Sequence, residues 1–413
     1  MTLLQPTKSF NISKGLIYEA YKRVKANKGS GGVDGQSLED FEQRLSQNLY
    51  KLWNRLSSGS YFPQAVKRVD IPKADGGMRP LGIPTVADRI AQMAVKMQIE
   101  PELESHFHPD SYGYRPGKSA HQALEIVRKR CWKRAWVLDM DIKGFFDAID
   151  HQLLQRAIDK HVKLSWQRLY IKRWLEAPVQ HADGHLEERT QGTPQGGVIS
   201  PLLANLFLHY VFDVWVGKHW KGIEFARYAD DIICHCRSEQ EAIELQALLT
   251  KRFNDCGLQL HPVKTKIVLC KDWKRKVDFD QVSFDFLGFT FRPRLIKASN
   301  GKRLVYFLPA ISQAAAKRIR EQINQWSWLK WSQNTIMDII WFSRNKIRGW
   351  MEYYGKFGRG AIINVLFHFD LRLTRWAMRK FKSVKTLMQG ANRVGIFRNK
   401  HRLFLAHWNR GRL

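Results

Sequence analysis

The sequence has few cysteines and no long apolar run. Its 413 residues include five cysteines, none of them spaced as C-x-x-C, which excludes a disulfide framework and suits a reducing compartment such as the cytosol. The same spacing leaves no pattern typical of a structural zinc site. The most apolar stretch, residues 201–216, is interrupted by Asn205, His209 and Asp213, so we expect no membrane-spanning helix. We also expect no signal peptide, because the first residues lack a basic segment followed by an apolar core.

Acidic residues are scarce relative to basic ones. The chain has 68 Lys and Arg against 38 Asp and Glu, a net charge of +30. From residue 291 onward 26 bases oppose 4 acids, a net +22, whereas the first 290 residues carry only +8. A positive field of this size is typical of proteins that bind a long phosphate backbone, and it argues against a small neutral metabolite as the only partner. A basic face kept only for solubility explains the asymmetry less well.

The character of the periodicity changes along the chain. The first part predicts a mixed α/β region whose strands fall at residues 66–72, 136–141, 225–228, 232–236 and 284–291. Beyond residue 308 the pattern predicts long, basic, Trp-rich helices at 312–328, 335–357 and 362–382. A domain boundary is therefore expected near residues 295–310.

Two adjacent carboxylates, Asp230 and Asp231, lie between two apolar runs of strand character. This arrangement predicts that they occupy the tip of a hairpin. Adjacent carboxylates repel each other unless a divalent cation or a basic group lies between them. A solvated acidic turn is the plain alternative, but the apolar flanks favour a functional pair.

A second acidic segment follows the predicted strand at 136–141. Asp139 and Asp141 fall on one face of that strand, so spacing alone leaves both as candidates. Three carboxylates brought together in this way can hold two Mg²⁺ ions about 4 Å apart, one activating a 3′-hydroxyl and one bridging nucleotide phosphates. A ring of Phe146 under the incoming sugar would exclude a 2′-hydroxyl, whereas core packing is the plain reading for Phe145 and Phe146 alike.

A third segment, QGTPQGGVISP at residues 191–201, is rich in glycine. Glycines let the backbone approach a nucleotide or template closely, and Gln195 could contact it. An ordinary turn before a helix is equally consistent with this segment taken alone.

In their order along the chain, these segments resemble a group II intron-encoded reverse transcriptase/maturase. The resemblance extends from about residue 27 to the C-terminus, and WFSRNKIRGWMEYYGKF at 341–357 resembles the thumb, or maturase-specific X domain, of that family. The other matching segments are KRVDIPK (67–73), YGYRPG (112–117), the Asp141 segment, TPQGG (193–197), YADD (228–231), LQLHPVKTK (258–266) and FLGF (286–289).

The resemblance implies a right-hand polymerase of mixed α/β (α+β) class followed by an all-α thumb/maturase X domain. The expected domains are an N-terminal extension and finger segment at 1–60, reverse transcriptase fingers and palm at 61–295, and the helical X domain at 305–413. Larger members of the family add a DNA-binding region and a zinc-supported endonuclease. Without the cysteine pairs of that endonuclease, this chain is expected to lack it.

The resemblance also implies roles for individual residues. Two Mg²⁺ ions and the catalytic role are expected at Asp141, Asp230 and Asp231, with the backbone near Ile142. Nucleotide contacts are expected from Lys73, Arg68, Phe146, Gln195, Lys264 and, ranked lower because relatives often carry the bidentate Arg there, Lys67. Lys264 is also a candidate proton donor to the leaving pyrophosphate, although a plain surface cation is nearly as consistent. Template or primer contacts are expected from Arg115, Leu287, Gly288 and Phe289, and RNA phosphate contacts from Arg344, Lys346 and Arg348.

The predicted function is an RNA-directed DNA polymerase encoded by a group II intron. It would copy intron RNA into DNA during retrohoming, using deoxynucleoside triphosphates and a DNA target or primer, and would also bind intron RNA as a maturase that promotes splicing. We expect a prokaryotic, cytoplasmic and nucleoid-associated protein with no membrane partner and make no prediction of oligomeric state. One alternative is a related reverse transcriptase used in host defence, spacer acquisition or a retron, which the maturase-like segment disfavours. The other is a non-catalytic RNA splicing factor, which the three intact aspartates disfavour.

Overall fold

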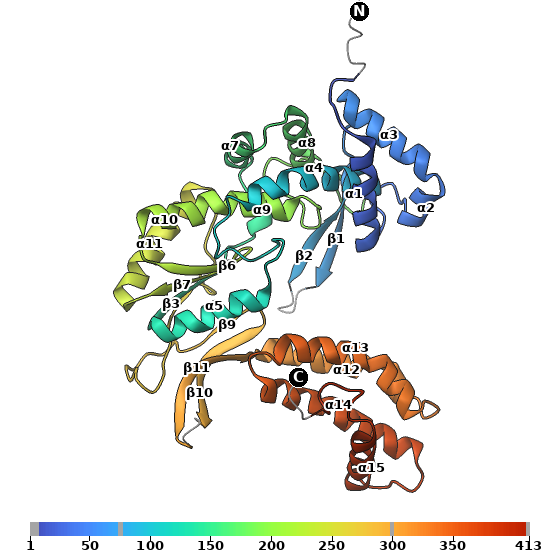
Figure 1. The fold of residues 1–413 in the computed structure, drawn as a ribbon, viewed down its shortest axis with the longest axis vertical. Helices are drawn as coiled ribbons and strands as arrows, with labels where there is room; N and C mark the ends of the chain where they lie inside the picture. Colours follow the sequence, from blue (N-terminus) through green and yellow to red (C-terminus); the bar gives the residue numbers. More distant parts are fainter. Residues whose placement is uncertain (1–7, 73–76, 298–300, 410–413) are drawn as a thin grey trace, which may run out of the picture. The chain divides into compact units, whose positions relative to one another are not determined.

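The computed structural model of the protein describes residues 8–72, 77–297 and 301–409 (Figure 1). By its internal packing the chain divides into two units, one of Met1–Ala123 with Leu138–Lys266 and one of Leu124–Val137 with Ile267–Leu413. The domain boundaries expected from the sequence remain predictions. The boundary expected near 295–310 coincides with a long hairpin in the second unit, formed by β10 (Phe289–Lys297) and β11 (Arg303–Ile311).

The first unit contains a four-stranded sheet whose strands run in the order β2-β1-β4-β5. Its antiparallel hairpin pairs β1 (Val66–Pro72) with β2 (Met78–Ile83), and β1 also runs parallel to β4 (Val179–Gln180), which pairs with β5 (Leu186–Glu187). Within β1 only Val66 is buried. Side chains on both faces of the outer hairpin are therefore available to a ligand.

The second sheet of this unit carries the acidic residues. Strands β6 (Glu224–Tyr228) and β7 (Asp231–Cys236) form an antiparallel hairpin, and β3 (Trp136–Met140) lies beside β7. These strands are almost wholly buried, as expected for apolar runs of four to six residues. The predicted hairpin tip is thus present, with Tyr228 paired to Asp231 across it.

Helices complete the first unit. They are α1 (Lys14–Asn27), α2 (Leu38–Gln43), α3 (Leu45–Ser58), α4 (Val86–Glu104), α6 (Phe145–Ala148), α7 (His151–His161), α8 (Ser165–Glu176), α9 (Ser200–Leu208), α10 (Val214–His219) and α11 (Glu239–Asp255). Between α9 and α10 the backbone forms a π-helical turn at His209–Asp213. Such turns insert an extra residue into a helix and redirect the side chains they carry.

The second unit combines strands with a basic helical bundle. Strands β11, β10 and β9 (Phe284–Phe286) form one sheet, β8 (Lys266–Leu269) leads into the unit, and α5 (Ala120–Lys133) contributes most of its length. The bundle comprises α12 (Gln313–Gln325), a short 3₁₀ turn at Ser327–Lys330, α13 (Ile336–Tyr354), α14 (Arg359–Lys380) and α15 (Leu387–Lys400). One apolar core, which includes Ile347, Phe369 and Trp376, joins these helices. Across the described residues no helix is long and apolar enough to cross a membrane.

Candidate functional site

Two of the predicted metal ligands approach each other in the first unit. Asp230 lies at the tip of the β6–β7 hairpin, and Asp141 follows the last residue of β3. The ammonium Nζ of Lys264 lies 3.1 Å from Oδ2 of Asp141. The segment that carries Lys264 is bonded to the acidic strand, because the backbone N–H of His261 donates to the carbonyl of Asp141 at 2.8 Å.

The electrostatics of Asp230 reveal the coupling of the two acids. Burial raises the pKa of the Asp230 carboxyl above its usual range, and the negative charge of Asp141 raises it further, while Arg79 and Lys264 act in the opposite direction. The charge of Asp141 thus reaches the hairpin tip. A partly buried pair of like charges of this kind is stabilised by a cation.

The carboxylates at this site fit a divalent metal ion in chemistry but are not closed around one. Across residues 8–72, 77–297 and 301–409, no group of three or more His, Cys, Asp or Glu side chains is arranged to hold a metal. Asp141 and Asp230 nonetheless offer hard oxygen donors, and the Lys264 ammonium already supplies positive charge at Asp141. Two backbone hydrogen bonds lie beside these carboxylates, one from the N–H of His261 to the carbonyl of Asp141 and one from the N–H of Lys143 to the carbonyl of Gln259. Neither hydrogen bond uses the backbone groups of Ile142, which was expected to lie near the metal ions.

Arg79, which was not predicted as a site residue, lies on β2 and connects the hairpin of β1 and β2 to the acidic site. Its Nε donates to Oε1 of Gln195 at 2.8 Å, and Nε2 of Gln195 donates to Oδ2 of Asp147 at 3.3 Å. The carbonyl of Gln195 also accepts a hydrogen bond from the N–H of Gly82. The glutamine expected at the nucleotide is thus held by three contacts. Register alone could have drawn attention to Arg79, which lies opposite Ile71 across β1 and β2.

Tyr114 is a second residue that the sequence analysis passed over. Its backbone has a φ of 57°, which is unfavourable for a side chain of this size. Burial raises the pKa of its phenol, and the charge of Asp230 contributes to the same shift. Its ring centroid lies 6.5 Å from that of Tyr228, so it borders the hairpin tip.

The basic residues of β1 divide between the two faces of the hairpin. Alternation places Lys67 on the same face as Ile71, and so on the face of Arg79, while Arg68 lies on the other face. Arg68 pairs with Asp70, its Nε lying 3.1 Å from Oδ1. Lys73, which was expected to meet the triphosphate, lies outside the described residues.

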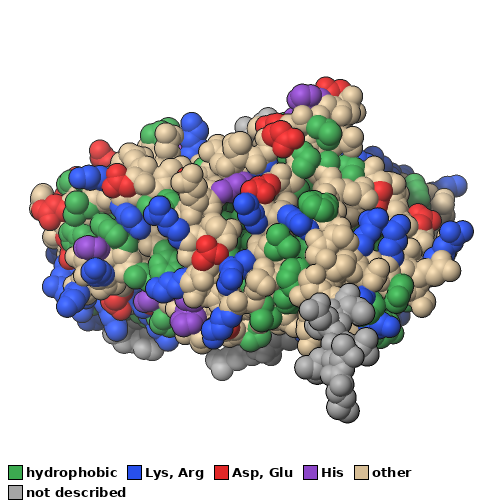
Figure 2. Space-filling view, turned by 90° about the horizontal axis from the view of Figure 1, so that it is seen from above, with side chains coloured by type: hydrophobic (Ala, Val, Ile, Leu, Met, Phe, Trp, Pro, Cys, Tyr) green, Lys and Arg blue, Asp and Glu red, His purple; other side chains and the backbone are tan. Residues whose placement is uncertain are grey.

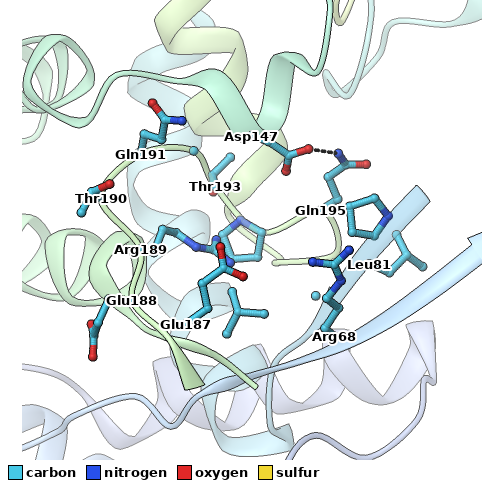
Figure 3. A pocket seen from close by; sticks show the side chains of 15 residues that line it. Arg68, Leu81, Asp147, Glu187, Glu188, Arg189, Thr190, Gln191, Thr193 and Gln195 are labelled. Atoms are coloured by element: carbon cyan, nitrogen blue, oxygen red, sulfur yellow. Dashed lines mark hydrogen bonds between the residues drawn. The ribbon is translucent and has the colours of Figure 1, made fainter. Parts of the chain in front are cut away.

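A cavity of about 380 Å³ lies beside the hairpin of β1 and β2, and both Arg68 and Leu81 line it (Figure 3). Its polar lining includes Arg68, Asp147, Glu187, Arg189 and Gln195. Burial lowers the pKa of the Arg189 guanidinium, and the carboxylates of Asp147 and Glu187 counteract that shift. The cavity therefore contains both signs of charge, and Gln195 separates it from Arg79.

Phe146 lies within the same part of the unit. Its side chain is 7% exposed and that of Phe145 is 2% exposed, and the two rings meet edge to face at 5.4 Å. The carbonyl of Phe146 accepts a hydrogen bond from the N–H of Thr193 at 2.7 Å, which ties it to the glycine-rich segment. Both phenylalanines are thus buried in the core, Phe145 slightly more deeply than Phe146.

Arg115, expected at the template or primer, makes its polar contacts inside the protein. The side chain is 6% exposed and its Nε lies 2.9 Å from Oε2 of Glu104. Its Nη1 donates to the carbonyls of His108 and Ser111. These contacts give Arg115 an architectural role in the segment that precedes α5.

The turn expected to grip the primer lies in the second unit. Leu287 and Gly288 join β9 to β10 with φ values of 51° and 78°, as in the two-residue turns that match strand twist. The hydroxyl of Tyr353 donates to the carbonyl of Leu287 at 2.9 Å, and a Cβ at position 288 would lie 3.2 Å from Oη of Tyr354. Phe289 is fully buried against these tyrosines. Helix α13 therefore holds the turn rigidly.

The three residues of α13 that were expected to bind RNA have different surroundings. Arg344 and Arg348 line a surface cavity of about 470 Å³ together with Phe404, whose ring is about half exposed. Lys346 instead lies with its Nζ 5.9 Å from the ring of Trp326. On the face shown in Figure 2, Lys and Arg side chains are spread over the surface with fewer acidic ones between them.

Comparison with known proteins identifies two family models in the chain. Residues 71–291 match "Reverse transcriptase (RNA-dependent DNA polymerase)" and residues 315–395 match "Group II intron, maturase-specific domain". Protein YkfC of Escherichia coli (strain K12) is 32% identical over 355 residues, which cover 76% of this chain and 88% of that protein.

Two further comparisons concern another intron-encoded protein and a solved structure. Group II intron-encoded protein LtrA of Lactococcus lactis subsp. cremoris is 37% identical over 202 residues, 47% of this chain, and the match spans 32% of LtrA. A solved structure of telomerase from Candida albicans with a fragment of telomeric RNA has a TM-score of 0.47 and 12% identity, over 91% of this chain and 68% of that one.

Replacing Asp230 by Asn tests whether the ionised carboxylate of Asp230 destabilises the folded state. The raised pKa of Asp230 means that the folded state holds this proton more tightly than the unfolded state, so its ionisation lowers stability as pH rises through that range. In EDTA we expect Asp230→Asn to melt above the wild type at pH 7, with the gain shrinking toward about pH 4, where carboxyls protonate in both states. Calorimetry at both pH values measures this. The exposed Asp255→Asn is the control, and an unchanged or lower melting temperature for Asp230→Asn at pH 7 contradicts the coupling.

Proposed function

The chain belongs to the reverse transcriptases that carry a group II intron maturase domain, and from its site we propose that it copies intron RNA into DNA in a Mg²⁺-dependent reaction. The observation that supports this most directly is the charge coupling of Asp141 and Asp230 beside Lys264 and Arg79. A pair of carboxylates with two neighbouring cations suits catalysis with metal ions and phosphates, whereas the binding of RNA alone does not require it.

In the proposed reaction the three aspartates Asp141, Asp230 and Asp231 hold the metal ions. Bound there, Mg²⁺ supplies activation of the primer 3′-hydroxyl and neutralises charge on the nucleotide phosphates. When the carboxylate of Asp141 is engaged in this way, its contact with Lys264 is no longer needed. Lys264 is then released to donate a proton to the leaving pyrophosphate.

The incoming deoxynucleoside triphosphate is proposed to lie against the face of the hairpin that carries Arg79. Arg79 and Lys67 share that face and would bind the triphosphate oxygens, with Lys73 as a further contact. Gln195, fixed by Arg79 and Asp147, would orient the nucleotide. We place Arg68 second to Lys67, because alternation puts the Arg68 side chain on the face of the hairpin opposite to Arg79.

The helical second unit is proposed to bind intron RNA and promote splicing, and the turn at Leu287–Phe289 to contact the primer. Support for RNA binding comes from the maturase-specific match and from the cavity that combines Arg344 and Arg348 with the exposed ring of Phe404. Basic side chains beside an aromatic ring suit single-stranded RNA. The maturase match also favours this role over a reverse transcriptase of host defence, spacer acquisition or a retron. Since YkfC and LtrA are bacterial, we propose a prokaryotic cytoplasm and nucleoid as the setting.

Primer extension tests the polymerase function. With an RNA template, a DNA primer, deoxynucleotides and Mg²⁺, we expect the wild type to extend the primer and Asp230→Asn/Asp231→Asn to lose at least about 1,000-fold of the rate, as when preorganised charge stabilisation is removed. Filter binding of the primer–template by both proteins is the control for folding and loading. A wild type that loads RNA but does not extend the primer would leave an RNA-folding factor.

Truncating Phe146 tests sugar selection. Because Phe146 is bonded to the glycine-rich segment and is less deeply buried than Phe145, Phe146→Ala is expected to admit ribonucleotides. The preference for deoxynucleotides in kcat/KM should fall by about 10- to 100-fold, the discrimination a pocket wall gives against one hydroxyl. Single-nucleotide incorporation with both sugars gives the ratio. Phe145→Leu, which changes the deeper ring, should leave that ratio close to the wild-type value. The same loss of selectivity in both variants would point to general loosening.

Salt dependence tests the RNA surface of α13. Replacing Arg344 and Arg348 by Gln removes two charges at the cavity, so we expect weaker binding of intron RNA and a salt slope shallower by about one for each phosphate that is no longer neutralised. Lys346→Gln on the same helix should change the slope less, since its ammonium lies over Trp326. An equal change in slope for each charge removed, so that the double variant loses just twice as much as Lys346→Gln, would show that α13 acts only through its total charge.

A further inference from the structure

A fully buried ion pair lies behind the turn that carries Asp230. The guanidinium of Arg227 on β6 and the carboxylate of Asp213 both have no exposed surface. Two hydrogen bonds join them in parallel, Nε to Oδ1 at 2.8 Å and Nη2 to Oδ2 at 2.6 Å. Burial alone would raise the pKa of Asp213, but the charge and hydrogen bonds of Arg227 outweigh it and lower that pKa, so the pair stays ionised.

The remaining guanidinium nitrogen reaches the turn itself. Nη1 of Arg227 donates to the carbonyl of Ala229 at 3.1 Å and to Oδ1 of Asn205 at 3.0 Å. Ala229 has a φ of 58°, in the left-handed region that few residues with a side chain adopt. Its carbonyl belongs to the peptide bond that leads into Asp230. Fixing that carbonyl therefore fixes the direction in which the Asp230 carboxylate leaves the turn.

The opposite side of the turn is held as closely. The side-chain amide of Asn205 donates to the carbonyl of Gly113 at 2.7 Å. A Cβ on Gly113 would lie 2.4 Å from the backbone nitrogen of Ala229, so only glycine lets the two backbones approach. The N–H of Tyr112 also donates to the carbonyl of Arg227 at 2.8 Å. The turn is thus confined between Arg227 and the backbone at Gly113.

The location of Asp213 depends on an irregularity in its helix. Asp213 is the last residue of the π-helical turn at His209–Asp213, between α9 and α10. A buried ion pair seldom stabilises a fold more than apolar residues of the same shape would. A π-helical turn that brings one buried carboxylate to the back of a catalytic hairpin is consistent with selection for geometry rather than for stability.

We infer that Arg227 is a positioning residue for the polymerase reaction, acting with Asp213 and Asn205 to fix the carbonyl of Ala229 and thereby the carboxylate of Asp230. The inference rests on the proposed function for its catalytic consequence. Its structural part, that Arg227 sets the metal affinity of the Asp230 turn, is measured without any polymerase assay.

The test compares Arg227→Met/Asp213→Leu, which replaces the buried pair by apolar side chains, with Arg227→Lys, which keeps the buried charge but loses the fork that reaches Ala229. Mn²⁺ binding to the nucleotide-free protein, followed by electron paramagnetic resonance, is expected to weaken about 10- to 100-fold in both variants, the usual cost of removing a group that orients a metal ligand. In primer extension kcat should fall by a similar factor, while KM for deoxynucleotides stays close to the wild-type value, since Arg79 and Lys67 are untouched.

Asp88→Asn is the matched control, because it removes another buried carboxylate of the same unit, one bonded to Tyr61 and Thr85 and not to the turn. It should leave the Mn²⁺ affinity of the Asp230 turn unchanged. If the double variant does not fold, Arg227→Lys carries the test. Wild-type Mn²⁺ affinity and kcat in a folded Arg227 variant overturn the inference, and so does an equal loss of affinity in Asp88→Asn. Weakened Mn²⁺ binding with no extension by the wild type would support the positioning role and refute the polymerase.

Discussion

The repulsion between Asp141 and Asp230 is the constraint around which the first unit is organised. Burial and the neighbouring charge both disfavour ionisation of Asp230, so the folded chain holds a carboxylate where a carboxylate is costly. Two cations partly offset this negative charge. Lys264 reaches Asp141 from the segment that follows α11, and Arg79 acts on Asp230 from the hairpin of β1 and β2. A site that disfavours its own ionised ligands gains most when a divalent cation and phosphates arrive together.

Charged groups also give this site its rigidity. Gln195 is held between Arg79 and Asp147, and the hairpin tip is held from behind by Arg227. Both devices place a cation, exposed in Arg79 and buried in Arg227, against an amide or a backbone carbonyl that must keep one orientation. The second unit obtains rigidity differently, through a turn at Leu287 and Gly288 fixed by tyrosines of α13 above an apolar core. The two units thus fix their turns by separate means.

The sequence predicted what depends on local pattern. Strand 66–72, the hairpin tip at Asp230 and the helix predicted at 335–357 follow from the periodicity of apolar residues, and the structure confirms them, with that helix at Ile336–Tyr354. Contacts between distant segments were not predictable, since no local pattern shows that Arg79 lies beside Gln195 or that a π-helical turn brings Asp213 to Arg227. The ordering of Arg68 above Lys67 depended on the bidentate fork of arginine, whereas the register shows that the two side chains lie on opposite faces of the hairpin. Likewise the spacing of Arg115 gave no sign that its guanidinium binds Glu104.

Anomalous diffraction from Mn²⁺ in crystals of the protein with primer–template and a non-hydrolysable deoxynucleotide would show whether Asp141 and Asp230 exchange the ammonium of Lys264 for a metal ion. We expect an anomalous peak bound by the carboxylates of Asp141 and Asp230. The Nζ of Lys264 should then have moved away from its 3.1 Å contact with Asp141. A complex with the nucleotide bound, the Lys264–Asp141 contact intact and no peak between the two carboxylates would contradict it.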